Sequence, residues 1–294
     1  MQSRAYLYLF IATLSWGGNT MIGKMAIGHI SPMILTFWRW VFAVALIALI
    51  SIPSLRRDWP LIRKNWLLLL AYGAFGYTAF NVLLYSALQY TTAINAAIEQ
   101  AGIPMLIFLF NFVLFGTRVS AAQIAGFVLT LVGIAVTASH GDFSTLLELT
   151  LNFGDVLVLI CVVVYAGYTI SLRWKPPIDW RSLMAVPAMA ALLTTVPLML
   201  WEVSTERAIW PDRTGWWVIA YVGIFPSLVS QILYIKGVEG IGPNRAGLFI
   251  NLIPAFGTIL SVLVLGERLQ FFHVAAILLV LSGIVIAEKG RPKT

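Results

Sequence analysis

Charged residues are scarce in this 294-residue chain: Asp, Glu, Lys and Arg together make up 11% of it. A soluble domain usually has about 25% charged residues, so the composition excludes an ordinary soluble enzyme. Intrinsic disorder is excluded as well, because 60% of the residues are hydrophobic. Of the charged residues, the acidic ones are fewer: 12 Asp and Glu against 19 Lys and Arg. In so apolar a chain we interpret the basic excess as the loops of a membrane protein, not as a nucleic-acid surface.

Cysteine and histidine are almost missing. The single cysteine, Cys161, lies within an apolar run, which excludes an internal disulfide and a cysteine-rich metal site. His29, His140 and His273 show no metal-ligand spacing. The chain also lacks a glycine-rich phosphate loop, a His-Glu-x-x-His motif and paired aspartates for a metal-bound diphosphate. We therefore predict no metal and no cofactor, and an intramembrane enzyme is a remote alternative.

Long hydrophobic runs dominate the chain, and its mean hydropathy is +0.90. A membrane-spanning helix needs about 20 mostly apolar residues. The first run is too long for a signal peptide and has no small-residue cleavage site, so we interpret it as a span. The sequence predicts an all-α membrane protein with ten transmembrane helices: Arg4–Ile27, Pro32–Ile52, Trp66–Leu88, Ala93–Phe115, Ala121–Ala138, Gly154–Leu172, Ser182–Trp201, Gly215–Lys236, Asn244–Leu265 and Gln270–Glu288.

Lys and Arg are distributed unequally between the two sides of these spans. The side that holds both termini carries 14 of the 19, the other side carries 4, and Arg39 lies inside a span. Cytoplasmic loops are rich in Lys and Arg, so both termini are predicted to be cytoplasmic. We expect an integral protein of a bacterial inner membrane. Its predicted state is a monomer, with the lipid bilayer and a small-molecule substrate as partners and no nucleic acid.

The chain repeats itself at half its length. Residues match at offsets of 149 or 150, as Tyr85 matches Tyr234. We predict two repeats of five spans each, residues 1–145 and 146–294. Because five is odd, the repeats must cross the membrane in opposite senses, which is typical of secondary transporters with a site near the bilayer midplane. The alternative is a duplication without mechanistic meaning.

Polar and aromatic side chains recur on one face of six spans: the first, third, fourth, sixth, eighth and ninth. These spans are related in pairs by the repeat, so we predict that they surround a central cavity, with the other four outside. The alternative is that the polar side chains only join helices. The candidate substrate-binding residues are Trp16, Asn19, Tyr77, Asn81, Tyr85, Asn95, Glu99, Tyr165, Tyr168, Ser227, Gln231, Asn244 and Asn251.

Three prolines lie inside spans of the predicted inner group: Pro104, Pro226 and Pro254. A proline cannot donate a hydrogen bond to the carbonyl four residues earlier. A carbonyl freed in this way must meet protein or a water-filled cavity within the membrane. We predict that the three prolines act as hinges. Two alternatives stay open: each proline only kinks its helix, or the freed carbonyl binds a substrate ammonium.

Glu99 is the only acidic residue deep within a predicted span. An ionisable residue inside the membrane suggests a functional role, so we expect Glu99 to bind a substrate ammonium or a proton. The alternatives are an ion pair with Arg39 and a protonated, hydrogen-bonding acid. We interpret Arg39 as a structural partner or as a residue that reaches toward the membrane surface.

Three segments carry a family resemblance. The third segment, Leu252–Leu269, contains a proline, then about a dozen apolar residues and then a Gly-Glu-Arg triplet at 266–268. The first half has Gly-Thr-Arg at 116–118 in place of this triplet and so lacks its acid. The three segments resemble the EamA-type branch of the drug/metabolite transporter superfamily over essentially the whole chain. The part that holds Asn95 and Glu99 is similar to YddG-type exporters of aromatic and small neutral amino acids. The segments are Leu14–Ala26, Ala87–Met105 and Leu252–Leu269.

The resemblance implies ten helices, outward transport and alternating access by rocking of the two halves. We therefore expect a secondary transporter that exports aromatic and small neutral amino acids and related amphipathic metabolites. The alternative is a multidrug exporter of lipophilic cations, because an aromatic cage with one acid also suits such cations. Proton exchange and facilitated diffusion stay open as the driving force.

Overall fold

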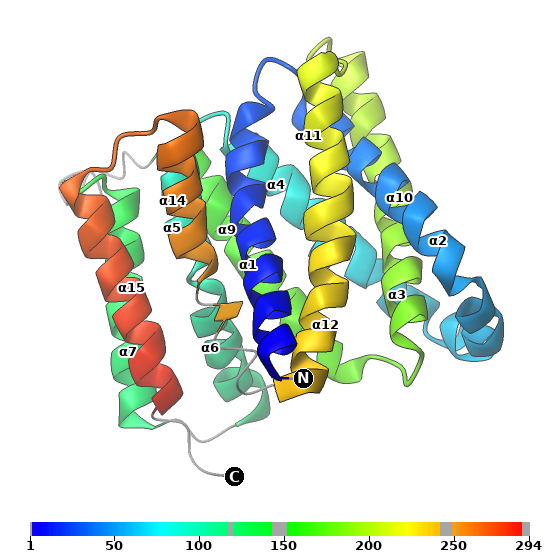
Figure 1. Ribbon diagram of the computed structural model, residues 1–294, viewed down its shortest axis with the longest axis horizontal. Helices are drawn as coiled ribbons and strands as arrows, with labels where there is room; N and C mark the ends of the chain where they lie inside the picture. The colour runs from blue at the N-terminus through cyan, green and yellow to red at the C-terminus, as the bar shows by residue number, and fades with distance from the viewer. Residues whose placement is uncertain (1, 117–119, 143–151, 242–248, 251, 290–294) are drawn as a thin grey trace.

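The computed structural model describes residues 2–116, 120–142, 152–241, 249–250 and 252–289, and the elements of these residues are all helices (Figure 1). The first half contains α1 (Gln2–Met25), α2 (Pro32–Lys64), α3 (Trp66–Ala71), η1 (Tyr72–Ala79), α4 (Phe80–Ala87), α5 (Ala93–Gln100), α6 (Ile103–Phe115) and α7 (Ala121–Ala138). The second half contains α9 (Phe153–Ser171), η2 (Leu172–Trp174), α10 (Trp180–Ser204), α11 (Arg213–Ile224), η3 (Phe225–Val229), α12 (Ser230–Ile241), α14 (Ile253–Leu265) and α15 (Phe271–Lys289). The all-α prediction is confirmed.

Six continuous helical stretches of the described chain are long and apolar enough to cross a membrane. α7, α14 and α15 are apolar but shorter in their described parts. With many large apolar side chains exposed on the outer surface, such as Leu263 at 76% and Phe271 at 87%, the protein is an integral membrane protein. The stretches are Pro32–Lys64, Trp66–Ala87, Ala93–Phe115, Phe153–Trp174, Trp180–Ser204 and Arg213–Tyr234.

The second predicted span is too short. We expected it to end at Ile52, before a polar connection, but α2 continues to Lys64 through Pro53 and Pro60. Each proline removes one helical hydrogen bond but leaves the chain free to continue. The extension is amphipathic: its buried face includes Asp58, which accepts a hydrogen bond from the backbone of Asp179 at 2.8 Å. Packing against the start of α10 therefore keeps this polar segment helical.

Three spans change their helical geometry midway. The third span contains the π-helical segment η1, and the eighth contains η3, which includes Pro226. The fourth is divided into α5 and α6 by a turn at Ala101 and Gly102, just before Pro104. Mid-helix π turns and breaks are frequent at functional sites. These three interrupted spans all belong to the predicted inner group.

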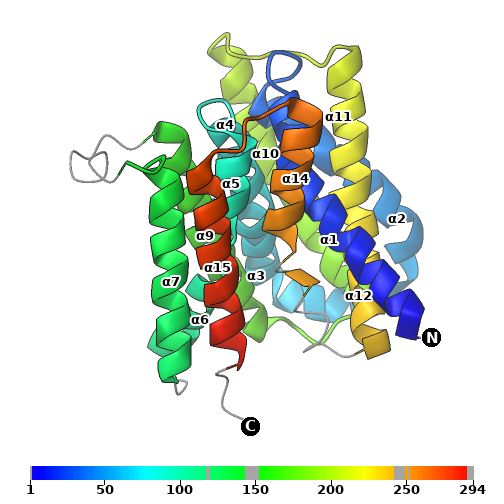
Figure 2. The same ribbon diagram turned by 60° about the vertical axis from the view of Figure 1, so that its left-hand side comes forward.

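The helices are arranged as an inner group between two outer pairs. α7 packs on α15 at one edge, and α2 packs on α10 at the other (Figures 1 and 2). Between them, α1 contacts α12 and α14, while α9 contacts α4 and α6. This arrangement agrees with the predicted division into six inner and four outer spans. The central cavity remains a prediction.

The two halves run in opposite directions. Lys24, at the end of α1, donates hydrogen bonds to the carbonyls of Leu88 and Thr91 at 2.7 and 2.6 Å. The start of α9 meets the same turn, because a Cβ added to Gly154 would lie 2.7 Å from the carbonyl oxygen of Ala87. The end of α1 and the start of α9 therefore lie together, at the end of the bundle away from the termini, which we call the distal end (Figure 1).

Glycines allow the outer helices α7 and α15 to approach closely. A Cβ added to Gly126 would lie 2.3 Å from the carbonyl oxygen of Gly283, and one added to Gly283 would lie 2.5 Å from that of Gly126. No larger residue fits this crossing without a shift of the backbones. Close contact at small residues is a common way for helices to associate in a membrane.

A fusion experiment tests the predicted orientation. Because of the bias in Lys and Arg, we expect a fluorescent protein fused to the C-terminus to fluoresce in the cytoplasm, and a C-terminal alkaline phosphatase fusion to be inactive. Phosphatase fused after Ser204, at the distal end of α10, serves as the positive control. Active phosphatase at the C-terminus would contradict the proposed topology.

Candidate functional site

Five aromatic side chains from α2, η1, α4 and α9 form a continuous row, which we call the aromatic row. Its members are Trp40, Tyr77, Tyr168, Tyr165 and Phe80. The Trp40 and Tyr77 rings stack with centroids 4.8 Å apart and planes at 6°. From Tyr77 the row continues to Tyr168 at 5.9 Å, to Tyr165 at 5.5 Å and to Phe80 at 4.7 Å. The three predicted tyrosines thus lie together, and Trp40 and Phe80 complete the row.

Trp16, in α1, makes a related contact with the second half. Its ring lies 5.4 Å from that of Tyr234, and its Nε1 donates a hydrogen bond to the carbonyl of Pro226 at 3.0 Å. Trp16 and Tyr165 are equivalent in the repeat, and each packs on an aromatic side chain of the opposite half. Both aromatic groups therefore join side chains of the two halves.

A buried arginine lies beside the aromatic row. Arg39 of α2 is 6% exposed, and its Nη1 donates to Asn19 Oδ1 at 3.0 Å and to the Tyr85 hydroxyl. The Tyr85 hydroxyl also donates to Asn19 Oδ1 at 3.0 Å. We call Asn19, Arg39 and Tyr85 the arginine cluster. The alternative of an ion pair between Arg39 and Glu99 is wrong, because Arg39 has no ion pair with a carboxylate among the described residues.

Asn95 lies in a second polar cluster at the distal end, where it joins two histidines. His273 Nδ1 accepts a hydrogen bond from the backbone of Gln270 at 3.0 Å. A neutral imidazole then carries its proton on Nε2, which lies 3.1 Å from Asn95 Oδ1. Asn95 Nδ2 in turn donates to His140 Nε2 at 3.3 Å. Two histidines that the spacing marked as unremarkable thus meet at a predicted site residue.

Glu99 lies one helical turn from Asn95 in the same region. Its side chain is fully buried, and within the described chain neither carboxylate oxygen has a hydrogen-bond partner. Asp155, which accepts a hydrogen bond from Thr91, is close enough to Glu99 to interact with it electrostatically. A buried carboxylate with no donor and no cation lacks the contacts that stabilise a negative charge. The arrangement therefore suits proton binding better than a substrate ammonium.

Glu267, the acid of the Gly-Glu-Arg triplet, binds the start of α5. Its carboxylate accepts hydrogen bonds from the backbone nitrogens of Ala93 and Ile94, at 2.9 and 3.0 Å. These are free donors at the start of α5, where a negative charge is also favoured by the helix dipole. Glu202 does the same for α2 through Ile34 at 3.1 Å. Both acids hold the distal end together, and sequence reasoning did not assign them this role.

Outside the spans, Asp212 connects the loop that contains His29 to the start of α11. It accepts a hydrogen bond from the backbone of Gly215 at 2.8 Å and lies 2.7 Å from His29 Nδ1. These two contacts, the backbone bond first, hold the pKa of Asp212 below its usual value. The pair is exposed and screened by water, so it positions loops and adds little stability.

The remaining predicted site residues have other surroundings. Asn81 donates to the Tyr77 carbonyl at 2.6 Å within its own span, and Ser227 donates to the Val222 carbonyl that Pro226 leaves free, at 2.7 Å. Gln231 is half-buried and makes no hydrogen bond to another described residue. Asn244 and Asn251 lie outside the described residues. The hinge roles of Pro104, Pro226 and Pro254 remain predictions.

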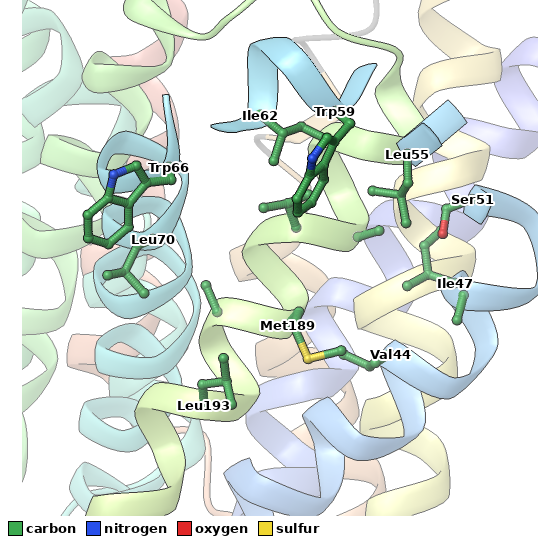
Figure 3. A pocket seen from close by; sticks show the side chains of 14 residues that line it. Val44, Ile47, Ser51, Leu55, Trp59, Ile62, Trp66, Leu70, Met189 and Leu193 are labelled. Atoms are coloured by element: carbon green, nitrogen blue, oxygen red, sulfur yellow. The ribbon is translucent and has the colours of Figure 1, made fainter. Parts of the chain in front are cut away.

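One groove of the described structure lies away from the centre, on the outer surface of α2, α3 and α10. It encloses about 350 Å³ between α2, α3 and α10 and is lined by apolar side chains such as Val44, Trp59 and Met189, with Ser51 (Figure 3). Trp59 and Leu193 are 60% exposed on this outer surface. It therefore faces the acyl chains of the bilayer and offers no polar group for orienting a metabolite.

Comparison of the sequence and the fold with known proteins identifies a family of membrane transporters. The EamA-like transporter family model matches residues 3–139 and 152–288, once in each half. A transporter of Bacillus subtilis with no assigned substrate, YyaM, is 24% identical over 96% of this chain and 93% of its own. The aromatic amino acid exporter YddG of Ancylobacter novellus is 24% identical over 89% of this chain and 88% of its own. A solved structure titled "Crystal structure of protein" has a TM-score of 0.65 at 21% identity and covers 98% of this chain and 97% of its own.

These matches define a membrane transporter with one EamA-like unit in each half, and not an enzyme. The chain belongs to the EamA-like transporter family, within the drug/metabolite transporter superfamily, and is a secondary transporter of a small molecule. The predicted repeat boundary, between residues 145 and 146, falls between the two matched segments and outside the described residues.

Proposed function

We propose that this transporter exports amino acids with aromatic side chains, small neutral amino acids and related amphipathic metabolites by alternating access. The observation that carries the proposal is that the rings pair across the two halves, Tyr77 with Tyr168 and Phe80 with Tyr165 in the aromatic row, and Trp16 with Tyr234 beside α1. The half-buried rings of Trp16, Tyr165 and Tyr168 leave surface for an apolar side chain. The similarity to an exporter of aromatic amino acids supports the same substrate class.

The rival substrate class is lipophilic cations. Aromatic rings attract cations, and one deep acid, Glu99, is present. However, none of the ring contacts or hydrogen bonds of the aromatic row involves Glu99 among the described side chains. A charged side chain that does contact the row is Arg39, over the ring of Trp40, and this cation repels a cationic substrate. This contact pattern favours amino acids over cations.

Transport by purified protein in liposomes tests the proposal. We expect uptake of labelled tryptophan and phenylalanine above that of protein-free liposomes, slower transport of threonine and methionine, and no transport of ethidium. Each substrate is measured with and without a pH gradient, because the driving force is part of the question. Transport of ethidium without transport of any amino acid would move the assignment to drug export.

A further inference from the structure

We propose that the guanidinium of Arg39 is the group that binds the substrate's carboxylate. The substrate class that follows is monocarboxylates with an aromatic or bulky apolar side chain, for which the amino group is not essential. The inference rests on the proposed function for the place of the site, between the arginine cluster and the aromatic row. It goes further in assigning the charge that the site recognises.

The first argument is that Arg39 is a buried charge with no counter-ion in the part of the chain that the structure describes. An arginine stays protonated in a protein, and an unpaired charge inside a membrane is costly. The ion pairs of the described residues are His29–Asp212, Arg57–Asp58 and Arg57–Asp179, all at the ends of the bundle. Asn19 and Tyr85 offer Arg39 only neutral oxygens. A negative charge brought by the substrate would supply the missing partner.

The second argument is the direction of the free donors. Both hydrogen bonds of Arg39 use Nη1. Nε is buried and has no hydrogen-bond partner, and Nη2 has none among the described residues. Nε and Nη2 form one edge of the planar guanidinium, and two parallel donors on one edge match the two oxygens of a carboxylate. The hydrogen bonds to Asn19 and Tyr85 hold the group rigid and leave this edge unused.

The third argument is the distance to the aromatic row. The guanidinium carbon of Arg39 lies 5.5 Å from the ring of Trp40, which stacks on Tyr77. Arg39 also lies close enough to Tyr165 to interact with it electrostatically. A carboxylate held by Arg39 therefore places an attached apolar side chain beside the rings. Glu99, which interacts with Asp155 and lies one turn from Asn95, is not needed for binding the carboxylate and can serve in proton binding.

Competition for binding to the wild-type protein gives the first test. Purified protein in nanodiscs is incubated with tritiated phenylalanine or tritiated phenylacetate and challenged with unlabelled phenylalanine, phenylacetate, phenethylamine or chloride. We expect phenylacetate to compete, and phenethylamine, which lacks the carboxylate, to be weaker by at least about tenfold. Phenethylamine that competes as well as phenylacetate would overturn the inference. Competition by chloride alone would also overturn it and would make Arg39 a site for a small anion.

Variants of Arg39 give the second test. Arg39→Gln should weaken binding of phenylacetate by at least about tenfold and remove the discrimination against phenethylamine, while Arg39→Lys should retain part of it because one donor and the charge remain. Arg173→Gln is the matched control, since this arginine lies in η2, after the end of α9, and donates a hydrogen bond to Asn111 instead of to the arginine cluster. A folded Arg39→Gln protein that still discriminates would overturn the inference. If that variant does not fold, the competition with wild-type protein decides.

The two proposals can fail separately. Binding of phenylacetate but of no amino acid, lost in Arg39→Gln, would support the carboxylate site and contradict amino-acid export. Binding of phenylalanine that is unchanged in a folded Arg39→Gln protein would support the proposed function and contradict the role of Arg39. Wild-type protein that binds neither labelled compound would contradict both.

Discussion

Glu99→Gln is expected to abolish the response of transport to a pH gradient while leaving exchange of labelled substrate across the membrane. Glu99 is fully buried, its oxygens have no hydrogen-bond partner in the described chain, and the acid Asp155 interacts with it electrostatically. Such a carboxylate can take up and release a proton as its surroundings change between the two states of an alternating-access cycle. Glutamine keeps the size of the side chain but cannot release a proton. The measurement is substrate flux in liposomes at equal and at unequal pH.

Glu202→Gln is the control for this experiment, because Glu202 is also a buried acid but accepts hydrogen bonds from Ser31, Met33 and Ile34. It should retain the gradient response. A gradient response that is unchanged in Glu99→Gln, or absent from the wild-type protein, would show that Glu99 does not couple protons. A Glu99→Gln protein that fails to fold would support a structural role for the buried acid.

Trp16→Ala and Tyr165→Ala are expected to weaken transport of tryptophan and phenylalanine by roughly 2–10-fold. Each removed ring costs on the order of 0.5–1.5 kcal/mol of aromatic contact beyond the buried area, and about 1.4 kcal/mol corresponds to a factor of ten. Threonine has little surface to stack on a ring, so its transport should change less. The measurement is the ratio of phenylalanine to threonine flux for each variant, in which general loss of folded protein cancels.

Trp217→Ala is the matched control, since this tryptophan is 71% exposed on the outside of the bundle. Its flux ratio should equal that of the wild-type protein. Equal losses for phenylalanine and threonine in Trp16→Ala and Tyr165→Ala would mean that these rings only pack the helices. A loss confined to ethidium would favour the export of lipophilic cations.

Much of the fold could be predicted because a membrane restricts structure so strongly. Only helices that satisfy their own backbone can span the bilayer here, so each apolar run marks a helix. The end of α2 was not predicted because Pro53, Pro60 and several charges indicate a loop, whereas burial of Ser54, Asp58 and Ile62 keeps the segment helical. A rule based on propensity cannot foresee a contact with α10, more than a hundred residues later.

Helical periodicity predicted which side chains share a face, but not which distant segments meet. Tyr77, Tyr165 and Tyr168 come together as their helical faces indicate. His140 and His273 are far apart in the chain, so no spacing could reveal that both meet Asn95. An ion pair between Arg39 and Glu99 was one alternative, because the opposite charges of two deep residues suggest a pair. In the described structure Arg39 bonds to Asn19 and Tyr85 instead, and the carboxylate oxygens of Glu99 have no hydrogen-bond partner.

The position of a bound substrate tests the central claim most directly. A photoactivatable phenylalanine analogue is cross-linked to the protein in liposomes, and the labelled peptides are mapped by mass spectrometry. We predict labels on α1 and α9 around Trp16, Tyr165 and Tyr168 that excess phenylalanine suppresses. Labels confined to the groove of α2, α3 and α10, around Val44, Trp59 and Met189 and unaffected by excess phenylalanine, would contradict a central aromatic site (Figure 3).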